Sequence, residues 1–235
     1  RRAPVSVAPI RRVGWVARGV DRDPAPGAGP WMVTLDQGGL AEAVAAGLEK
    51  EGLTVVRRGP GESGIPRPPG GADARWGGVV FAAALDVPAG AGDLPGAVEA
   101  SCLDLLGVIQ GMGETARPDA RVLILTRGCQ PVGDLSRNAS PLGGAVWGLA
   151  RSVRGERPEL RCTTLDLDAE PLPAPGHGAM AGGGNPTSVP DRGVAEALAG
   201  GDDAEVALRD GERWVARLTA AELEPLEAAP PGPYT

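Results

Sequence analysis

Residues 140–168 read SPLGGAVWGLARSVRGERPELRCTTLDLD, and this stretch decides the fold. Its apolar residues follow helical spacing over about 142–156, so a helix that carries Trp147 is expected there. The helix should end at Arg157, because the residue before a proline disfavours the helical conformation. A strand is expected over about 161–167, and it ends in acidic residues. A helix followed by such a strand is part of the unit from which parallel α/β sheets are built.

The segments around this stretch continue the alternation of strands and helices. Apolar runs predict strands at 13–19, 30–36, 53–58, 78–86 and 120–128. Helical spacing predicts helices at 40–52, 95–114 and 191–200. Two alternating runs around Asp210-Gly211 predict a closing β-hairpin over 204–218. The order of elements indicates an α/β fold with a mostly parallel, doubly wound sheet, helices on both faces and a C-terminal β-hairpin.

These elements are expected to form one domain over residues 13–218. Residues 1–12 and 219–235 read as linkers, and the Gly- and Pro-rich residues at about 170–190 read as a flexible insertion. The chain has 235 residues, of which 42% are hydrophobic, so it can bury a large core. Only 3% are aromatic, so that core must consist mainly of Ala, Val and Leu.

Charge and cysteine usage limit the expected partners. The formal net charge is −7 and the arginines are spread along the chain, whereas a nucleic-acid surface needs clustered cations, so no nucleic acid is expected. No run of 18 apolar residues occurs, so no membrane contact is expected. Cys102, Cys129 and Cys162 are widely spaced and sit among apolar residues, as small buried thiols do. With no signal-peptide pattern at the N-terminus, these features predict a cytoplasmic protein.

The stretch LDQGGLAEAVAAGL, residues 35–48, occupies the place of a dinucleotide-binding turn, between a first strand and a helix. Such a turn needs G-x-G-x-x-G, so that the backbone can approach a pyrophosphate at the helix N-terminus. Here Gly38 and Gly39 have no third glycine after them until Gly47, and Asp36 places negative charge beside the phosphate position. We therefore expect a degenerate turn at Gly38 and Gly39 and no cofactor-binding residue in this chain.

Residues for carbonyl reduction or acyl transfer do not occur in a workable arrangement. A reductase needs a Tyr with a nearby Lys or Asn to pass a proton to the carbonyl oxygen. The only tyrosine is Tyr234, and the only lysine, Lys50, is far from it in the sequence. No G-x-S-x-G motif occurs, and the only histidine, His177, lies in the predicted flexible insertion, which is a poor mount for a general base. No catalytic residue is expected.

Two sets of charged residues could bind something. Asp166 and Asp168 lie on one face at a strand end and could hold a metal, but acids there usually end a strand in water, so no metal site is expected. Arg151, Arg154 and Arg157 share one face of their helix. They could pair with acids of a partner, or they could form a solvated face.

The opening stretch resembles the end of the structural subdomain in ketoreductases of modular polyketide synthases. That family shows a WGLGR motif, a helix that ends in Glu-x-Pro-Glu, and a strand that reads DLD or DLP. The matching residues are Trp147-Gly148-Leu149-Ala150-Arg151, Glu156-Arg157-Pro158-Glu159 and Leu165-Asp166-Leu167. The likeness runs from about residue 13 to 235: VGWVAR resembles the opening strand of the family and EVALRDGERWVARL its closing hairpin. One departure is Gly143-Gly144, where the family more often has Gln-Ala.

This resemblance implies a truncated, Rossmann-like fold of the short-chain dehydrogenase/reductase type that has no catalytic residues. It implies a structural subdomain that stabilises and positions a separate catalytic subdomain, in cis or in trans, where NADPH is expected. That partner would reduce β-ketoacyl groups on an acyl carrier protein in polyketide biosynthesis, among the other domains of the synthase. The candidate interface residues are Trp15, Trp147, Arg151 and Trp214.

Three other interpretations stay open at the level of sequence. The chain could be a pseudo-ketoreductase, a scaffold in a module without reductase activity. It could be a stand-alone reductase-like enzyme with an unrecognised site, although the missing Tyr with Lys or Asn argues against that. It could also be an interaction module that docks a carrier protein through Arg151 and Arg154.

Overall fold

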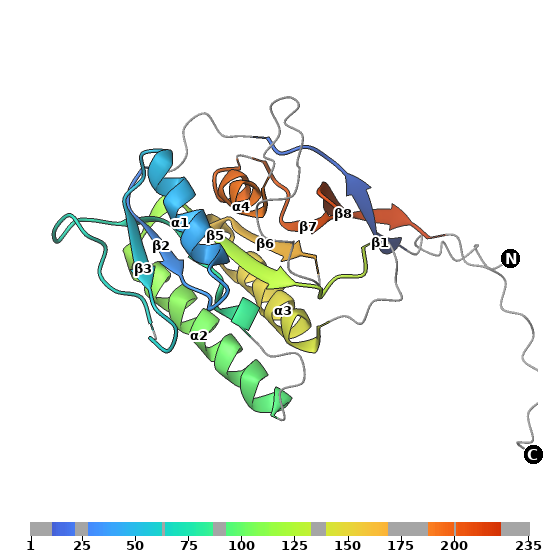
Figure 1. Cartoon of the computed structure of the whole chain (residues 1–235), viewed down its shortest axis with the longest axis horizontal. Coiled ribbons are helices and arrows are strands. Elements are labelled where there is room, and N and C mark those ends of the chain that lie inside the picture. The colour runs from blue at the N-terminus through green and yellow to red at the C-terminus, as the bar shows by residue number, and fades with distance from the viewer. Residues whose placement is uncertain are drawn as a thin grey trace, which may run out of the picture.

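Apolar alternation and segments rich in glycine or proline divide the chain into strands and helices, and the strands form a single sheet (Figure 1). The computed structural model describes residues 11–21, 28–62, 64–86, 93–132, 140–168, 188–199 and 201–221. The strands are β1 (Arg11–Ala17), β2 (Trp31–Thr34), β3 (Val55–Arg58), β4 (Trp76–Phe81), β5 (Ala116–Arg127), β6 (Cys162–Leu167), β7 (Glu205–Arg209) and β8 (Glu212–Ala220). The helices are α1 (Leu40–Lys50), α2 (Leu94–Thr115), α3 (Pro141–Glu156) and α4 (Val189–Ala197), with short 3₁₀ turns η1 (Ala83–Asp86) and η2 (Pro158–Leu160).

The sheet has the order β1-β8-β7-β6-β5-β4-β2-β3. Every neighbouring pair from β3 through β7 is parallel, whereas β8 pairs antiparallel with both β7 and β1. After β2 the chain first adds β3 on one side and then β4 on the other, which is the reversal of a doubly wound sheet. The predicted Rossmann-like α/β class and the C-terminal hairpin are therefore confirmed.

Helices cover both faces of the sheet and divide the core into two layers (Figure 1). Helices α1 and α4 pack against each other on one face, and α2 and α3 do so on the other. Side-chain alternation along β2 supplies both layers, because Trp31 belongs to the α1/α4 layer and Met32 to the α2/α3 layer. The α1–α4 contact is close: a Cβ added at Gly47 would lie 2.5 Å from a methyl group of Val194.

The stretch at 140–168 folds as its pattern predicts. Helix α3 begins after Ser140, whose side chain accepts a hydrogen bond from the amide of Gly143, and it ends at Glu156. The η2 turn follows, and Arg161, in the left-handed region at φ 42°, leads the chain into β6. Trp147 is 1% exposed, so it packs in the core.

Some boundaries differ from those expected. The strand predicted at 78–86 ends at Phe81, because the hydroxyl of Thr34 accepts the amides of Ala82 and Ala83 at 2.8 and 3.3 Å and turns the chain into η1. Strand β1 begins at Arg11, inside the predicted linker. Most of the predicted insertion at 170–190 and of the C-terminal linker lies outside the described residues.

Candidate functional site

The turn between β2 and α1, where a dinucleotide fold binds its phosphates, is closed by the chain's own carboxylates. Asp36 Oδ1 accepts a 2.7 Å hydrogen bond from the amide of Ala41 in the first turn of α1. Asp86 accepts the amide of Gln37, also at 2.7 Å. Burial raises the pKa of Asp86 above its ordinary value, although that amide opposes the shift. The helix N-terminus, a natural anion site, is therefore already occupied by Asp36.

The two glycines of this turn have different local roles. Gly39 caps α1 at φ 78°, in the left-handed region that glycine adopts most readily. A Cβ on Gly38 would lie 2.9 Å from Oδ2 of Asp36, so the missing side chain leaves room for that carboxylate. The arrangement does not fit a bound pyrophosphate.

A buried carboxylate organises the carboxyl ends of β5, β6 and β7. Asp166 is fully buried and accepts hydrogen bonds from the hydroxyl of Thr126 at 2.7 Å and from the amides of Cys129 and Gln130 at about 3 Å. Arg209 of β7 pairs with the same carboxylate. The expectation that acids at this strand end lie in water is wrong for Asp166, because amide, hydroxyl and guanidinium donors replace the water.

Trp147 joins α3 to this buried cluster. Its indole Nε1 donates to Thr126 Oγ1 at 2.9 Å, and that hydroxyl in turn donates to Asp166. On its other side, the Trp147 ring lies 6.2 Å from the ring of Trp15 at an angle of 57°. Of the four candidate interface residues, the fold thus brings Trp15 and Trp147 into direct contact.

The other two candidates lie on either side of this pair. Trp214 faces Ala17 across the β1–β8 register, two pairs along from Trp15, and is half-buried. Arg151 extends from α3 to Glu205 of β7, with 2.6 Å between Nε and Oε1. Arg154 reaches the same Oε1 at 2.6 Å. Sequence reasoning missed Glu205, because nothing in the pattern of β7 indicates which helix it faces.

The two arginines that share Glu205 change its pKa. Burial alone would raise the pKa of Glu205, but its hydrogen bonds and ion pairs with Arg151 and Arg154 outweigh burial and hold the pKa below its ordinary value. The third arginine of that helix face, Arg157, pairs with Glu159. All three arginines therefore have acidic partners within this chain.

The cysteines are arranged as structural thiols. Cys129 and Cys162 are buried and Cys102 is half-buried, and all three are free. Burial, reinforced by the charge of Asp166, strongly raises the pKa of the Cys129 thiol. Burial also raises the pKa of Cys162 to about 11, although Arg154 opposes the shift. Thiols that stay protonated at neutral pH are poor nucleophiles and poor metal ligands.

Among the other candidate catalytic and metal residues, the structure describes only part. Lys50 is exposed in the last turn of α1. Tyr234 and His177 lie outside the described residues. Within the described ranges, no three His, Cys, Asp or Glu side chains converge as a metal site. The described helices also include none that is long and apolar enough to cross a membrane.

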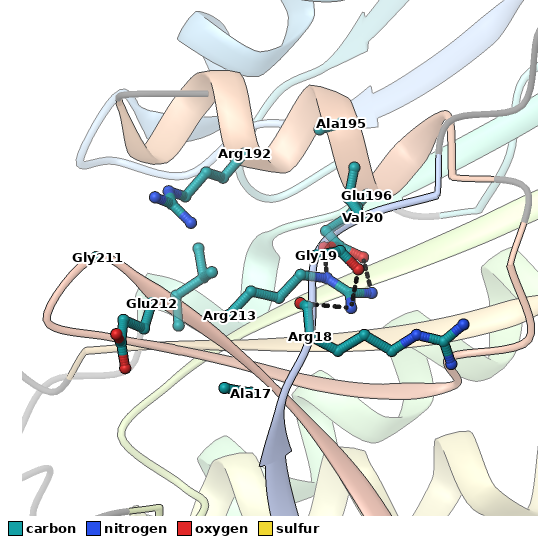
Figure 2. Close-up of a pocket in the computed structure, with 11 residues that line it drawn as sticks. Ala17, Arg18, Gly19, Val20, Arg192, Ala195, Glu196, Gly211, Glu212 and Arg213 are labelled. Atoms are coloured by element: carbon teal, nitrogen blue, oxygen red, sulfur yellow. Dashed lines mark hydrogen bonds and ion pairs between the residues drawn. The ribbon is translucent and has the colours of Figure 1, made fainter. Parts of the chain in front are cut away.

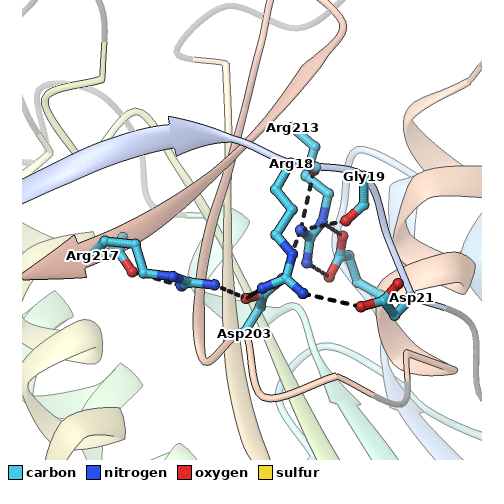
Figure 3. Close-up of polar contacts among 8 residues, drawn as sticks. Arg18, Gly19, Asp21, Asp203, Arg213 and Arg217 are labelled. Atoms are coloured by element: carbon cyan, nitrogen blue, oxygen red, sulfur yellow. Dashed lines mark hydrogen bonds and ion pairs between the residues drawn. The ribbon is translucent and has the colours of Figure 1, made fainter.

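A second charged cluster fixes the β1–β8 strands to α4 (Figure 3). Arg213 of β8 has a side chain that is only 7% exposed, and it pairs with Glu196 of α4 and with Asp203. Arg217 and Arg18 reach the same Asp203. Burial would raise the pKa of Asp203, but the guanidinium groups of Arg217 and Arg213 outweigh burial and lower it. The cluster therefore acts as a structural clamp between the β1–β8 strands and α4.

Beside this clamp lies a cavity of about 330 Å³ between the end of β1, α4 and the β7–β8 turn (Figure 2). Its walls are apolar at Ala17, Ala195 and Leu208 and charged at Arg192 and Glu212. The described residues that line it include no Ser, Thr, Cys, His, Tyr or Lys, and of its two carboxylates, Glu196 is paired with Arg213.

Comparison with known proteins agrees with this picture of a reductase-like fold. Over residues 41–218, the chain matches the family described as "Polyketide synthase extender module SpnB, Rossmann fold domain". The "Spectinabilin polyketide synthase system protein NorB" of Streptomyces orinoci is 32% identical over 216 residues. That match covers 89% of this chain but only 8% of the relative, so the chain spans a small part of that protein.

Solved structures share the fold at low sequence identity. One is titled "Adenylation, ketoreductase, and pseudo Asub multidomain structure of a keto acid-selecting NRPS module", with a TM-score of 0.66, 12% identity, and coverage of 90% of this chain and 18% of that one. Another is titled "Structure of A-type Ketoreductases from Modular Polyketide Synthase", with a TM-score of 0.59, 20% identity, and coverage of 95% and 45%.

Proposed function

Because the chain belongs to the family of Rossmann fold domains of polyketide synthase extender modules typified by SpnB, we propose that it is the structural, non-catalytic subdomain of a ketoreductase in such a synthase. In this role it stabilises and positions a catalytic subdomain that binds NADPH. The catalytic subdomain reduces β-ketoacyl groups carried on an acyl carrier protein. The remaining partners are the other domains of the synthase.

The observation that carries this proposal is the position of Asp36. Its carboxylate accepts the first-turn amide of α1 at 2.7 Å, in the place where a cofactor pyrophosphate would need that amide. A second anion there would meet like-charge repulsion, which disfavours binding. NADPH accordingly belongs to the partner subdomain.

The buried cluster at the carboxyl ends of β5 and β6 supports the same conclusion. In open α/β folds this edge holds substrate and reacting groups. Here Trp147, Thr126 and Asp166 fill it with side chains that are each 1% exposed or less. These side chains hydrogen-bond to one another, so the cluster is better suited to making this edge rigid than to taking part in a reaction.

Docking of a carrier protein through the α3 arginines is less well supported. Arg151 and Arg154 share Glu205, and Arg157 pairs with Glu159, so their charge is largely neutralised within the chain. A carrier that used them would first have to displace these acids.

The test is a pair of NADPH titrations followed by nicotinamide fluorescence, one on this chain and one on the full synthase polypeptide. We expect no saturable binding by this chain, but saturable binding by the full polypeptide together with NADPH-dependent reduction of a β-ketoacyl thioester. Tight binding by this chain would contradict its non-catalytic role. A full polypeptide that neither binds NADPH nor reduces the thioester would instead indicate a pseudo-ketoreductase scaffold.

A further inference from the structure

The cavity beside α4 has the size and the lining of a small-molecule site. Its volume of about 330 Å³ lies at the lower end of the range of about 300–1,000 Å³ that ligand pockets occupy. Three separate segments supply its apolar walls, through Val20 after β1, Ala195 of α4 and Leu208 of β7. Ala195 and Leu208 are almost fully buried, so the packing of the domain holds these walls in place.

A buried ion pair that also lines this cavity has its partners within the chain. Glu196 of α4 accepts hydrogen bonds from Nε and Nη2 of Arg213 (Figure 2). The third guanidinium nitrogen, Nη1, donates to Asp203 at 2.9 Å and to the backbone carbonyl of Gly19 at 3.1 Å. Because these groups satisfy one another, the pair has no free charge with which to attract a ligand.

Two other charged residues line the cavity on facing sides. Arg192 belongs to α4, and Glu212 is the first residue of β8. Figure 2 shows the Arg192 side chain extending from the helix and the Glu212 side chain lying across the cavity from it. With the residues that the structure describes, neither the guanidinium group nor the carboxylate forms a hydrogen bond or an ion pair. One positive and one negative charge are therefore available to a ligand.

The charge of Arg192 acts toward the interior of the cavity. Arg192 precedes Glu196 by four residues, so both side chains lie on the same side of α4. Burial raises the pKa of Glu196, whereas its hydrogen bond with Arg213 and the charges of Arg213 and Arg192 oppose that shift. Since Arg213 supplies the hydrogen bonds to Glu196, the guanidinium donors of Arg192 remain available to an anion that enters the cavity.

The lining indicates the chemical class of the ligand. A carboxylate suits Arg192, because guanidinium and carboxylate groups form two parallel hydrogen bonds. An ammonium group suits Glu212, and an aliphatic chain suits the apolar walls, because its burial removes apolar surface from water. A simple anion or a simple cation would match only one of the two charges. A small zwitterion with an aliphatic chain matches all three parts of the lining.

We propose that this cavity binds a free aliphatic amino acid. Its carboxylate pairs with Arg192, its ammonium group pairs with Glu212, and its side chain packs against the apolar walls. This site is independent of the proposed function, because it needs neither NADPH nor a catalytic subdomain. The NADPH titrations and the amino acid titrations can therefore fail separately.

NMR titrations of the isotope-labelled chain test the ligand class. L-leucine is the probe, and two analogues each lack one of its charges: isocaproate has no ammonium group and isoamylamine has no carboxylate. We expect L-leucine to shift the backbone amide signals of Glu196 and Gly211 saturably, because both residues line the cavity. Each analogue should bind about five-fold more weakly, because one charged contact is lost. No saturable shift of these signals with L-leucine, or equal affinity for the three compounds, would overturn the proposal.

Two variants that each remove one charge separate the two contacts. R192Q should weaken the binding of L-leucine and isocaproate about five-fold and leave that of isoamylamine within about two-fold, because only the carboxylate loses its partner. E212Q should weaken L-leucine and isoamylamine instead and spare isocaproate. R67Q and E99Q are the matched controls, since both residues are exposed and lie outside the lining of the cavity. If R192Q binds L-leucine as R67Q does, or E212Q as E99Q does, the assigned contact is wrong.

Discussion

Trp147 of α3 and Thr126 of β5 are joined by a 2.9 Å hydrogen bond from the indole Nε1 to the hydroxyl oxygen, in a region that is almost fully buried. The same hydroxyl donates to Asp166 of β6. A chain of hydrogen bonds thus connects helix α3 through strand β5 to strand β6, at the sheet edge where related folds carry out chemistry.

Trp147→Phe should destabilise the domain by about 1–3 kcal/mol, because Thr126 loses a buried donor and the smaller ring leaves space in the core. The free energy of unfolding, measured with urea, checks this. Trp15→Phe is the control: Trp15 is only partly buried, and its substitution should cost less. Equal losses for the two variants would mean that packing, rather than the hydrogen bond, determines the effect.

Asp166→Asn should be more damaging, by about 3–5 kcal/mol, because it leaves Arg209 without its charged partner in a buried site. The amide group of Asn would also point donors at the backbone amides of Cys129 and Gln130. Asp210→Asn makes the same chemical change at an exposed turn residue and should stay within about 0.5 kcal/mol. Thermal or urea denaturation compares the two, and similar stabilities would refute the role of Asp166.

Gly47→Ala should lower stability by about 1–3 kcal/mol, because its Cβ would lie 2.5 Å from Val194 and force α1 and α4 apart. Gly148→Ala, on the exposed side of α3, meets nothing within 4 Å and should raise stability by about 0.5–1 kcal/mol through helix propensity alone. Unfolding curves of the two variants should therefore show a lower stability for Gly47→Ala and a higher stability for Gly148→Ala than for the unmodified chain. If Gly47→Ala stabilises as well, the close α1–α4 contact is wrong.

Acid should weaken the contact between α3 and β7 through Glu205. Its folded pKa lies below the ordinary value of 4.5, so its stabilisation is fully present above that pH and is lost as the pH falls through the folded pKa. The stability gap between the unmodified chain and Glu205→Gln should therefore be widest near neutral pH and narrow in acid. Urea unfolding at pH 7 to 3 measures it, with the exposed Glu212→Gln as control. A stability difference between the two proteins that stays constant with pH would contradict the lowered pKa of Glu205.

The sequence predicted most elements of the fold because their signals are local. Periodicity placed the α3 helix, and the Arg157-Pro158 step placed its end. The predicted strand at 78–86 was too long, because its last residues are apolar but Thr34, 48 residues earlier, captures the amide of Ala82. The two strand-end aspartates could be found by pattern, but the burial of Asp166 could not.

The sequence by itself determined the order of strands and helices, the loss of the third glycine after Gly39, and the family to which the chain belongs, since each depends on residues close together along the chain. Only the tertiary structure decided that Asp36 occupies the helix N-terminus, that Arg209 neutralises Asp166 from 43 residues away, and that two opposite charges face each other across the cavity beside α4. The physical reason is that burial and pairing arise from groups that only folding brings together, so no local pattern encodes them.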